Sequence, residues 1–179
     1  MLVLVVGPSG AGKDTLINGA KAALAGDARF VFPRRAVTRQ AVAELEDHDS
    51  VTREEFALRA ANGAYALSWE AHGLSYGLPA SISDEIAAGR VVIMNGSRAM
   101  VGAARERFAG TKVLLIEATP QVRAVRLAGR GRETEAEIAA RLAREVVTDI
   151  PQAIHIDNSG EVAEGVGRFV LALRSLASD

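Results

Sequence analysis

The residues with the clearest chemical meaning stand at positions 7–14, directly after the apolar run 2–6. They read GPSGAGKD, and their three glycines let successive backbone N–H groups turn toward phosphate oxygens. The helix expected from Asp14 adds the positive end of its dipole, and Lys13 supplies a mobile charge for β- and γ-phosphates. This G-x-x-x-x-G-K pattern between a strand and a helix predicts a loop that binds a nucleoside triphosphate. The residues expected around the phosphates are Gly7, Pro8, Ser9, Gly10, Ala11, Gly12, Lys13, Asp14 and Thr15.

Asp14 stands where this pattern usually carries Ser or Thr, whose hydroxyl binds Mg²⁺. Its carboxylate could hold Mg²⁺ directly or through water, and Thr15 follows it with a hydroxyl. Asp14 and Thr15 are therefore the predicted metal ligands. The alternative is that Asp14 only stabilises the start of the helix through the helix dipole.

Two polar clusters follow the second predicted strand. Arg35, Thr38 and Arg39 fall where a parallel α/β sheet faces its ligand, and guanidinium forks match phosphate oxygens. A solvated basic patch is the alternative. The next cluster could accept hydrogen bonds from sugar hydroxyls or hold Mg²⁺, or it could form a solvated acidic loop. It comprises Glu44, Glu46, Asp47, His48 and Asp49, with His48 also a candidate polar ligand or general base.

Further candidates for substrate contact lie in residues 69–77 and after the apolar run 91–94. Tyr76 could donate its hydroxyl to an acceptor phosphate and His72 could contact substrate, whereas Trp69 is expected to pack. Asn95 stands where an Asp often holds Mg²⁺ through water, and Arg98 opens the next helix beside the site. The turn 157–160 follows the last strand, where the nucleotide base would lie.

Arginines and glycines are concentrated in residues 126–133, which we interpret as a lid. A lid that brings guanidinium groups over a transferring phosphoryl group would exclude water and stabilise the charge of the transition state. The predicted catalytic residues are Lys13, Arg126, Arg130 and Arg132. Arg141 and Arg144 could reach the same space. The alternative is that these arginines pair with nearby glutamates at the surface.

The composition of the chain excludes several classes of protein. It has 179 residues, a net charge of −1 and no cysteine, so there is no basic excess for nucleic-acid binding and no disulfide or thiolate metal site. No apolar run approaches the roughly 20 residues of a membrane span. The expected location is the cytoplasm, and the oligomeric state is left open, a homodimer included.

Short apolar runs alternate with helical patterns along the chain. Strands are expected at 2–6, 30–32, 65–69, 74–76, 90–94, 113–117 and 153–157, and helices at 14–25, 52–61, after Pro79, at 97–108, from Pro120, at 134–147 and at 161–176. This rhythm predicts an α/β fold with a parallel sheet flanked by helices. We expect a single domain over 1–179, with a core of 1–34 and 81–179 and an acceptor-binding insertion at about 35–80.

The order of these motifs resembles the guanylate kinase family of P-loop kinases. The resemblance rests on residues 7–13, Thr38-Arg39, Tyr76-Gly77 and the arginine-rich lid, and it covers nearly the whole chain. The chain departs from guanylate kinases at Asn95, where they carry a carboxylate that reads guanine. It also lacks their second arginine shortly after Thr38-Arg39.

The chain is more similar to the ribose 1,5-bisphosphate phosphokinases of phosphonate catabolism. The shared motifs are GPSGxGKD, RRxxTR, EDH, WxAHGLxYG and NxSR. This resemblance implies transfer of the γ-phosphoryl group of ATP to ribose 1,5-bisphosphate, which yields 5-phosphoribosyl 1-diphosphate and ADP. It also implies Mg²⁺ as cofactor and a sugar bisphosphate as small-molecule partner. The alternatives are a guanylate-type nucleoside monophosphate kinase and a non-catalytic nucleotide-binding module.

Overall fold

The computed structural model describes the whole chain apart from residues 40–47, 72, 130–138, 140–141, 143–149 and 179. The chain divides into two compact units, and the strand that precedes the glycine-rich loop contributes to both. After the roles expected from the sequence, we call Met1–Leu4 with Gly26–Thr111 the acceptor unit and Val5–Ala25 with Lys112–Asp179 the nucleotide unit. We use these two names throughout.

Five strands form a sheet in the order β2-β7-β1-β8-β9. Its strands are β1 (Leu2–Val6), β2 (Phe30–Val31), β7 (Val91–Asn95), β8 (Lys112–Glu117) and β9 (Ile154–Asp157). The pairs β2–β7 and β8–β9 are parallel. All five residues of β1 are buried, as continuous apolar strands of a sheet covered on both faces should be. The predicted α/β fold with a parallel sheet is confirmed.

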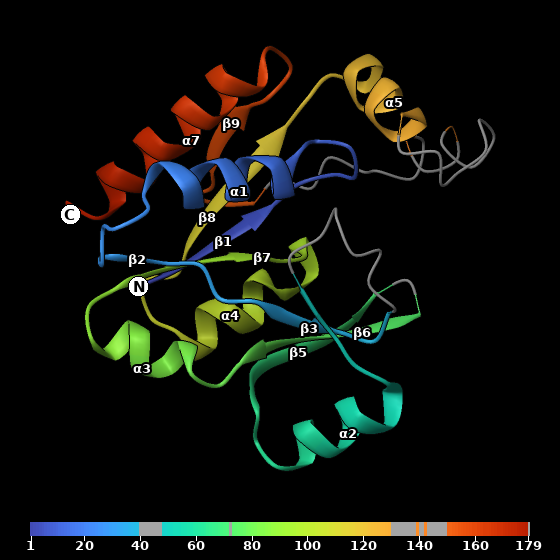
Figure 1. Ribbon diagram of the computed structural model, residues 1–179, viewed down its shortest axis with the longest axis vertical. Helices are drawn as coiled ribbons and strands as arrows, with labels where there is room; N and C mark the ends of the chain where they lie inside the picture. Colours follow the sequence, from blue (N-terminus) through green and yellow to red (C-terminus); the bar gives the residue numbers. More distant parts are fainter. Residues whose placement is uncertain (40–47, 72, 130–138, 140–141, 143–149, 179) are drawn as a thin grey trace. The chain divides into compact units, whose positions relative to one another are not determined.

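The nucleotide unit is built from β8, β9 and three described helices. These are α1 (Lys13–Ala23), α5 (Pro120–Ala128) and α7 (Val162–Leu176). Helices α1 and α7 lie side by side (Figure 1). Gly19 permits this approach, because a Cβ at that position would stand 2.5 Å from Cγ2 of Val166. The helix predicted at 134–147 lies almost entirely outside the described residues.

The acceptor unit contains a second sheet of four strands in the order β4-β3-β6-β5. They are β3 (Arg35–Val37), β4 (His48–Ser50), β5 (Tyr65–Ala71) and β6 (Leu74–Pro79). The sequence predicted β5 and β6, which form an antiparallel hairpin. It did not predict β3 and β4, which are three residues long and carry too few apolar residues for a periodic signal. His48 and Asp49 therefore belong to a strand and not to an acidic loop.

Four helical segments complete the acceptor unit. They are α2 (Arg53–Ala61), α3 (Ile82–Ala87), the 3₁₀ turn η1 (Arg98–Met100) and α4 (Val101–Arg107). The side chain of Thr52 caps the start of α2, since its hydroxyl oxygen accepts from the backbone N–H of Glu55 at 3.0 Å. The helix predicted at 97–108 is correct in place, but it opens with a 3₁₀ turn.

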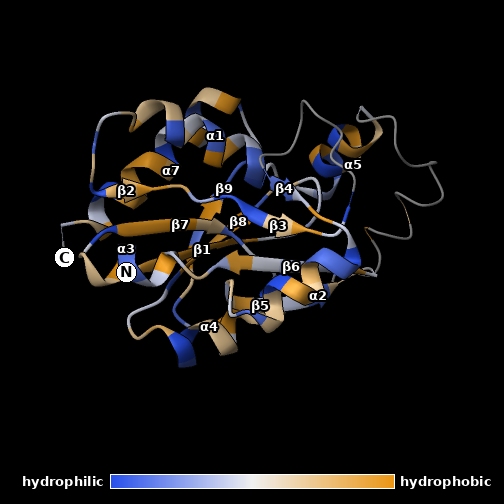
Figure 2. Cartoon of the chain, turned by 60° about the horizontal axis from the view of Figure 1, so that its bottom comes forward, coloured by the Kyte–Doolittle hydropathy of each residue, from blue (hydrophilic) through white to orange (hydrophobic). Residues whose placement is uncertain are grey.

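Hydropathy along the strands separates the two sheets. Figure 2 shows β7 in hydrophobic colours along most of its length, whereas β3 changes from hydrophilic to hydrophobic. The second sheet is stabilised on one side by a small cluster in which Ala36, Val51 and Phe56 are buried and Tyr65 packs against them. The rings of Phe56 and Tyr65 stack with centroids 4.7 Å apart. The short strand β3 is thereby packed, through Ala36, against a cluster that contains two stacked aromatic rings.

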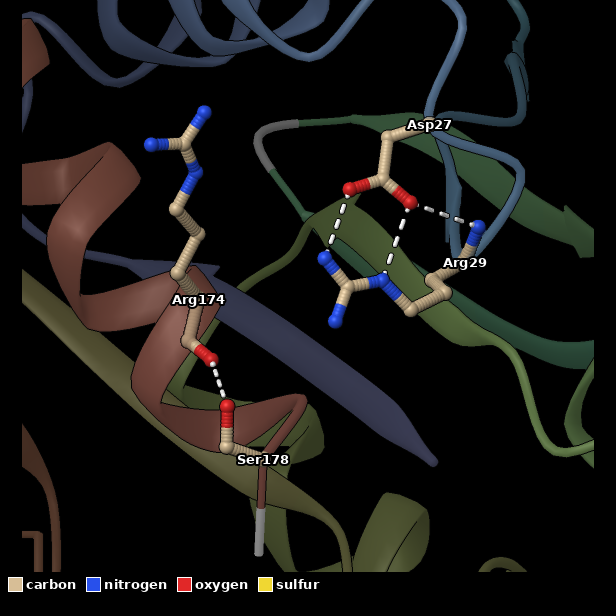
Figure 3. A network of polar contacts seen from close by, with 4 residues as sticks. All are labelled: Asp27, Arg29, Arg174 and Ser178. Carbon is tan, nitrogen blue, oxygen red and sulfur yellow. Dashed lines mark hydrogen bonds and ion pairs between the residues drawn. The ribbon is translucent and has the colours of Figure 1, made fainter.

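Side chains also secure the turns at the borders of elements. The Arg29 guanidinium donates to both carboxylate oxygens of Asp27, at 3.0 and 2.8 Å, in the turn before β2 (Figure 3). The Ser178 hydroxyl donates to the Arg174 carbonyl at 3.0 Å, just after the end of α7. Both contacts are exposed, so each contributes little to stability beyond defining local geometry.

Among the described residues, the helices are all too short or too polar to cross a lipid bilayer.

Gly77 tests how tightly the second sheet is packed. A Cβ at Gly77 would stand 2.6 Å from Cδ1 of Tyr65, so Gly77→Ala should displace the ring and lower the free energy of unfolding by about 1–3 kcal/mol. The matched control is Gly167→Ala in α7, where a Cβ meets nothing within 4 Å. That control should be neutral or more stable by up to about 1 kcal/mol. Urea unfolding measures both, and equal effects would contradict the close contact.

Candidate active site

The glycine-rich loop has a backbone that only glycine tolerates at three places. Gly7, Gly10 and Gly12 have φ values of +147°, +79° and +90°. A Cβ on Gly7 would also collide with the carbonyl oxygen of Ile116 in β8. The first loop residue therefore has to be glycine for two independent reasons, the backbone angle and the close passage of the neighbouring strand.

Lys13 lies over the loop at the first residue of α1. Its Nζ donates to the carbonyl oxygens of Gly7 at 2.7 Å and Pro8 at 3.1 Å. The amino group is therefore held above the phosphate-binding turn. A triphosphate that enters the loop meets this charge together with the first turn of α1.

Side chains from outside the loop contact its other carbonyl groups. Nε of Arg123, a residue of α5, donates to the Ser9 oxygen at 3.0 Å. Nδ2 of Asn158, which follows β9, donates to the Ala11 oxygen at 2.7 Å. Nη1 of Arg126 approaches the same Ala11 oxygen at 3.5 Å. The sequence placed Arg126 in a lid and Asn158 beside the base, but no pattern in it predicted these loop contacts.

The end of β9 carries a small polar turn. The Ser159 hydroxyl donates to Asp157 Oδ1 at 2.6 Å and accepts from the backbone N–H of Thr119 at 3.1 Å. The hydrogen bond from Ser159 is the main reason that the pKa of Asp157 lies below its usual value. The turn thereby ties the start of α5 to the end of β9, and α5 is the helix that presents Arg123 and Arg126.

Asp14 and Thr15 occupy the first turn of α1, where both were expected. Asp14 is half-buried and Thr15 is exposed. In the part of the chain that the structure describes, no three His, Cys, Asp or Glu side chains group into a metal site. Mg²⁺ fits this arrangement, because it commonly binds one carboxylate and completes its shell with phosphate oxygens and water.

The acceptor unit presents an aromatic stack with an arginine on it. Tyr76 of β6 stacks on its register partner Trp69 of β5, with ring centroids 5.1 Å apart and planes 11° apart. The guanidinium carbon of Arg35 lies 5.5 Å from the Tyr76 centroid, and Arg35 Nη1 donates to the Asn95 carbonyl at 3.3 Å. Because β6 lies between β3 and β5, Arg35 and Trp69 flank Tyr76 from opposite sides. Three predicted substrate residues, Arg35, Tyr76 and Asn95, are thus brought together.

Thr38 closes the end of β3 against β6. Its hydroxyl accepts from the backbone N–H of Ser75 at 2.8 Å, and its own N–H donates to the Ser75 carbonyl at 3.0 Å. This double contact fixes the backbone that leads to Arg39, which is half-buried. Thr38 therefore has a structural task in addition to any contact with substrate.

The remaining predicted residues of the acceptor unit lie in different surroundings. His48 is only 2% exposed, and its carbonyl accepts from Arg34 Nη2 at 2.7 Å. Arg34 also pairs with Asp49 at 3.2 Å, so this arginine serves strand β4. Arg98 is half-buried in η1, one residue after Ser97, whose hydroxyl caps the turn. The role of His48 in reading a sugar stays a prediction.

Several predicted residues lie outside the described part of the chain. They are Glu44, Glu46, Asp47, His72, Arg130, Arg132, Arg141 and Arg144.

Comparison with individual known proteins shows the family of the chain. No family model matches the chain. A ribose 1,5-bisphosphate phosphokinase PhnN of Brucella abortus is 50% identical over 177 residues, which cover 98% of this chain and 92% of that protein. One from Methylobacterium radiotolerans is 49% identical and covers 97% of both chains. A bifunctional ribose 1,5-bisphosphokinase-thymidine phosphorylase of Azorhizobium caulinodans is 49% identical over 97% of this chain and 25% of that protein.

A solved structure shares the fold at low sequence identity. The guanylate kinase of Anaplasma phagocytophilum matches with a TM-score of 0.73 and 20% identity, over 99% of this chain and 87% of that chain. This likeness agrees with the architecture of a parallel sheet flanked by helices. About half of the residues are identical to those of its relatives over nearly the whole chain. The chain therefore belongs to the ribose 1,5-bisphosphate phosphokinase family and has a guanylate kinase-like fold.

Proposed function

We propose that the protein is a kinase that transfers the γ-phosphoryl group of ATP to ribose 1,5-bisphosphate and releases 5-phosphoribosyl 1-diphosphate and ADP. The observation that carries this proposal is the 50% identity over 98% of the chain to a relative named for that activity. The loop geometry supports a triphosphate donor independently. The sequence resemblance adds a place in phosphonate catabolism, and ATP consumption fits a cytoplasmic reaction.

The chemistry needs positioning and charge stabilisation more than proton transfer. An oxygen of the acceptor's 1-phosphate attacks the γ-phosphorus of ATP, and the bond from that phosphorus to the β–γ bridging oxygen breaks. The attacking oxygen is already ionised, so no general base is required. Catalysis then depends on holding two polyanions together and neutralising the charge that spreads over the transferring group.

On the donor side, residues 7–15 hold the phosphates of ATP. Lys13 exchanges its loop carbonyls for β- and γ-phosphate oxygens and stabilises the transferring group. Arg126 assists from α5, where it already reaches the loop at the Ala11 carbonyl. The sequence adds Arg130 and Arg132 as further cations of the lid. Asp14 or Thr15 would hold Mg²⁺, which would offset the negative charge of the phosphates.

On the acceptor side, the two phosphates of ribose 1,5-bisphosphate call for several cations. Arg35, Arg39 and Arg98 are proposed to bind them, with the Tyr76 hydroxyl as a further donor. The Arg35–Tyr76 contact supports this, since it holds a guanidinium beside the ring whose hydroxyl is the further donor. The residues proposed to complete this side are Thr38, Glu46, Asp47, His48, His72 and Asn95.

The deciding experiment supplies the enzyme with ATP, Mg²⁺ and one acceptor at a time and follows products by ³¹P NMR. Ribose 1,5-bisphosphate should give a new diphosphate signal and GMP should give none. Turnover of GMP alone would replace the proposal with a guanylate kinase activity. ATP binding without turnover of either acceptor would favour a non-catalytic nucleotide-binding module.

Lys13→Met should remove the charge that stabilises the transferring group. We expect kcat to fall on the order of 10²–10³-fold, the usual loss when a transition-state donor is deleted. Lys21→Met is the matched control, because Lys21 lies in the last turn of the same helix and is exposed. A coupled ADP-release assay compares the two, and a Lys13→Met enzyme as fast as the control would refute the assignment.

Arg39→Ala should weaken the binding of the acceptor and leave the binding of the donor ATP unaffected. The loss of a charged hydrogen bond to phosphate costs about 1.5–3 kcal/mol, which corresponds to about a 10–100-fold higher KM for ribose 1,5-bisphosphate. The KM for ATP should stay constant. The control is Arg107→Ala, an exposed arginine of α4. Unchanged acceptor KM in the Arg39 variant would exclude its role.

Trp69 offers a direct signal of acceptor binding. It is the single tryptophan of the chain, and it stacks on Tyr76, whose hydroxyl is proposed to donate a hydrogen bond to an acceptor phosphate. Titration with ribose 1,5-bisphosphate, without nucleotide, should therefore shift or quench its emission. Tyr76→Phe, which keeps the ring and removes the hydroxyl, should weaken the apparent affinity. An emission that responds to ATP but not to the sugar bisphosphate would argue against the acceptor assignment.

A further inference from the structure

The phosphate loop is secured through its carbonyl groups by two buried side chains from outside it. Arg123, which is 7% exposed, donates to the Ser9 carbonyl, and Asn158, which is 3% exposed, donates to the Ala11 carbonyl. The first comes from α5 and the second from the end of β9. Neither residue belongs to the glycine-rich motif or to the acceptor unit, and the proposed mechanism assigns no role to either.

The local structure is built around the Asn158 side chain. A Cβ on Gly12 would collide with its Nδ2, and a Cβ on Gly165 of α7 would collide with its Oδ1. The amide is therefore wedged between the loop and α7, with a glycine on each side. Asn158 is also tied by its backbone, since its N–H donates to the Glu117 carbonyl at 2.7 Å. Its Nδ2 points at the loop, where the Ala11 carbonyl accepts from it.

Arg123 approaches the loop in a similarly close manner. A Cβ on Gly10 would stand 3.0 Å from the Arg123 carbonyl oxygen and 3.2 Å from its Cβ. The residue before Gly10 is Ser9, whose carbonyl accepts from Arg123 Nε at 3.0 Å. The glycine thus lets the backbone of α5 approach while the guanidinium holds the preceding peptide unit.

A carbonyl held outward sets the direction of the next N–H. In a planar trans peptide the C=O and the following N–H point in opposite directions. A Ser9 oxygen bound to Arg123 therefore directs the Gly10 N–H away from Arg123, and an Ala11 oxygen bound to Asn158 directs the Gly12 N–H away from Asn158. These are two of the N–H groups that a phosphate would meet, and a carbonyl in their place would repel it.

We propose that Arg123 and Asn158 are positioning residues, which hold the Ser9 and Ala11 carbonyls outward and so set the affinity of the loop for a nucleoside triphosphate. The inference rests on the proposed function only in its nucleotide-binding half. It deepens that function by explaining what pre-organises the loop before ATP arrives. Each of the two side chains governs one identifiable backbone N–H.

The test uses the full-length chain with Asn158→Ala, Asn158→Asp and Arg123→Met. Calorimetric titration at a temperature where all variants are folded gives the Kd of ATP. We expect Asn158→Ala and Arg123→Met each to raise the Kd of ATP on the order of 10-fold, as for one lost buried hydrogen bond. Asn158→Asp should bind ATP more weakly still. Its ionised carboxylate has the shape of the amide but cannot donate a hydrogen bond, and it brings negative charge toward the phosphates. Packing alone would predict the opposite order, with the isosteric Asp closer to the parent than Ala.

Matched controls separate this role from general damage. Asn18→Ala changes an exposed asparagine of α1, and Arg168→Met changes an exposed arginine of α7 whose Nε also donates to a backbone carbonyl, that of Asp157. Both should keep the parental Kd for ATP. Acceptor KM at saturating ATP should be unchanged in every variant. A lower unfolding temperature with an unchanged Kd in the Asn158 and Arg123 variants would overturn the proposal.

Amide NMR provides a second readout that a purely structural role would not move. In the parent, ADP should shift the Gly10 and Gly12 signals. Arg123→Met should reduce mainly the Gly10 shift, and Asn158→Ala mainly the Gly12 shift, whereas equal losses at both would contradict the one-to-one assignment. Because ATP and ADP binding need no acceptor, failure of the sugar-phosphate reaction leaves this test intact. A parent that binds neither nucleotide would overturn both proposals.

Discussion

The phosphate loop depends on the direction of its backbone carbonyls. Gly7 passes so close to Ile116 that no side chain fits, and the carbonyls of Gly7, Pro8, Ser9 and Ala11 each accept a hydrogen bond. Since a buried carbonyl without a donor is costly, the loop and the elements around it have to be built together. Strand β1, the start of α1, helix α5 and the end of β9 all serve this one turn.

The acceptor unit uses a different physical principle, the mutual support of aromatic and charged side chains on a small sheet. Strands β3 and β4 are only three residues long. Strand β3 pairs with β6 of the hairpin, and β4 pairs with β3. The stacked rings of Phe56 and Tyr65 pack in the cluster that buries Ala36 of β3. On this sheet Trp69 and Arg35 flank Tyr76. These contacts give the polar side chains of the sheet a fixed geometry without a large core.

In the proposed function both units bind phosphate groups, as phosphoryl transfer between two polyanions requires. The chain as a whole carries a net charge of only −1, so attraction for phosphate comes from local placement of cations and helix ends and not from overall charge. Asp14 is the exception at the loop, a carboxylate beside a polyanion. A divalent cation between the two would resolve this repulsion, which is why Asp14 is coupled to Mg²⁺ in the proposed function.

The sequence determined the alternation of strands and helices, the phosphate loop and its lysine, and the family to which the motifs belong. These features are local, because a five-residue apolar strand, a glycine-rich turn and a helix cap each carry their signal within a few neighbouring positions. Only the tertiary structure decided that β3 and β4 are strands and that Arg35, Tyr76 and Trp69 stack. It alone decided that Asn158, 147 positions from Ala11, donates to the loop. Such contacts join residues far apart in the chain, and their partners are chosen by packing, which no local pattern encodes.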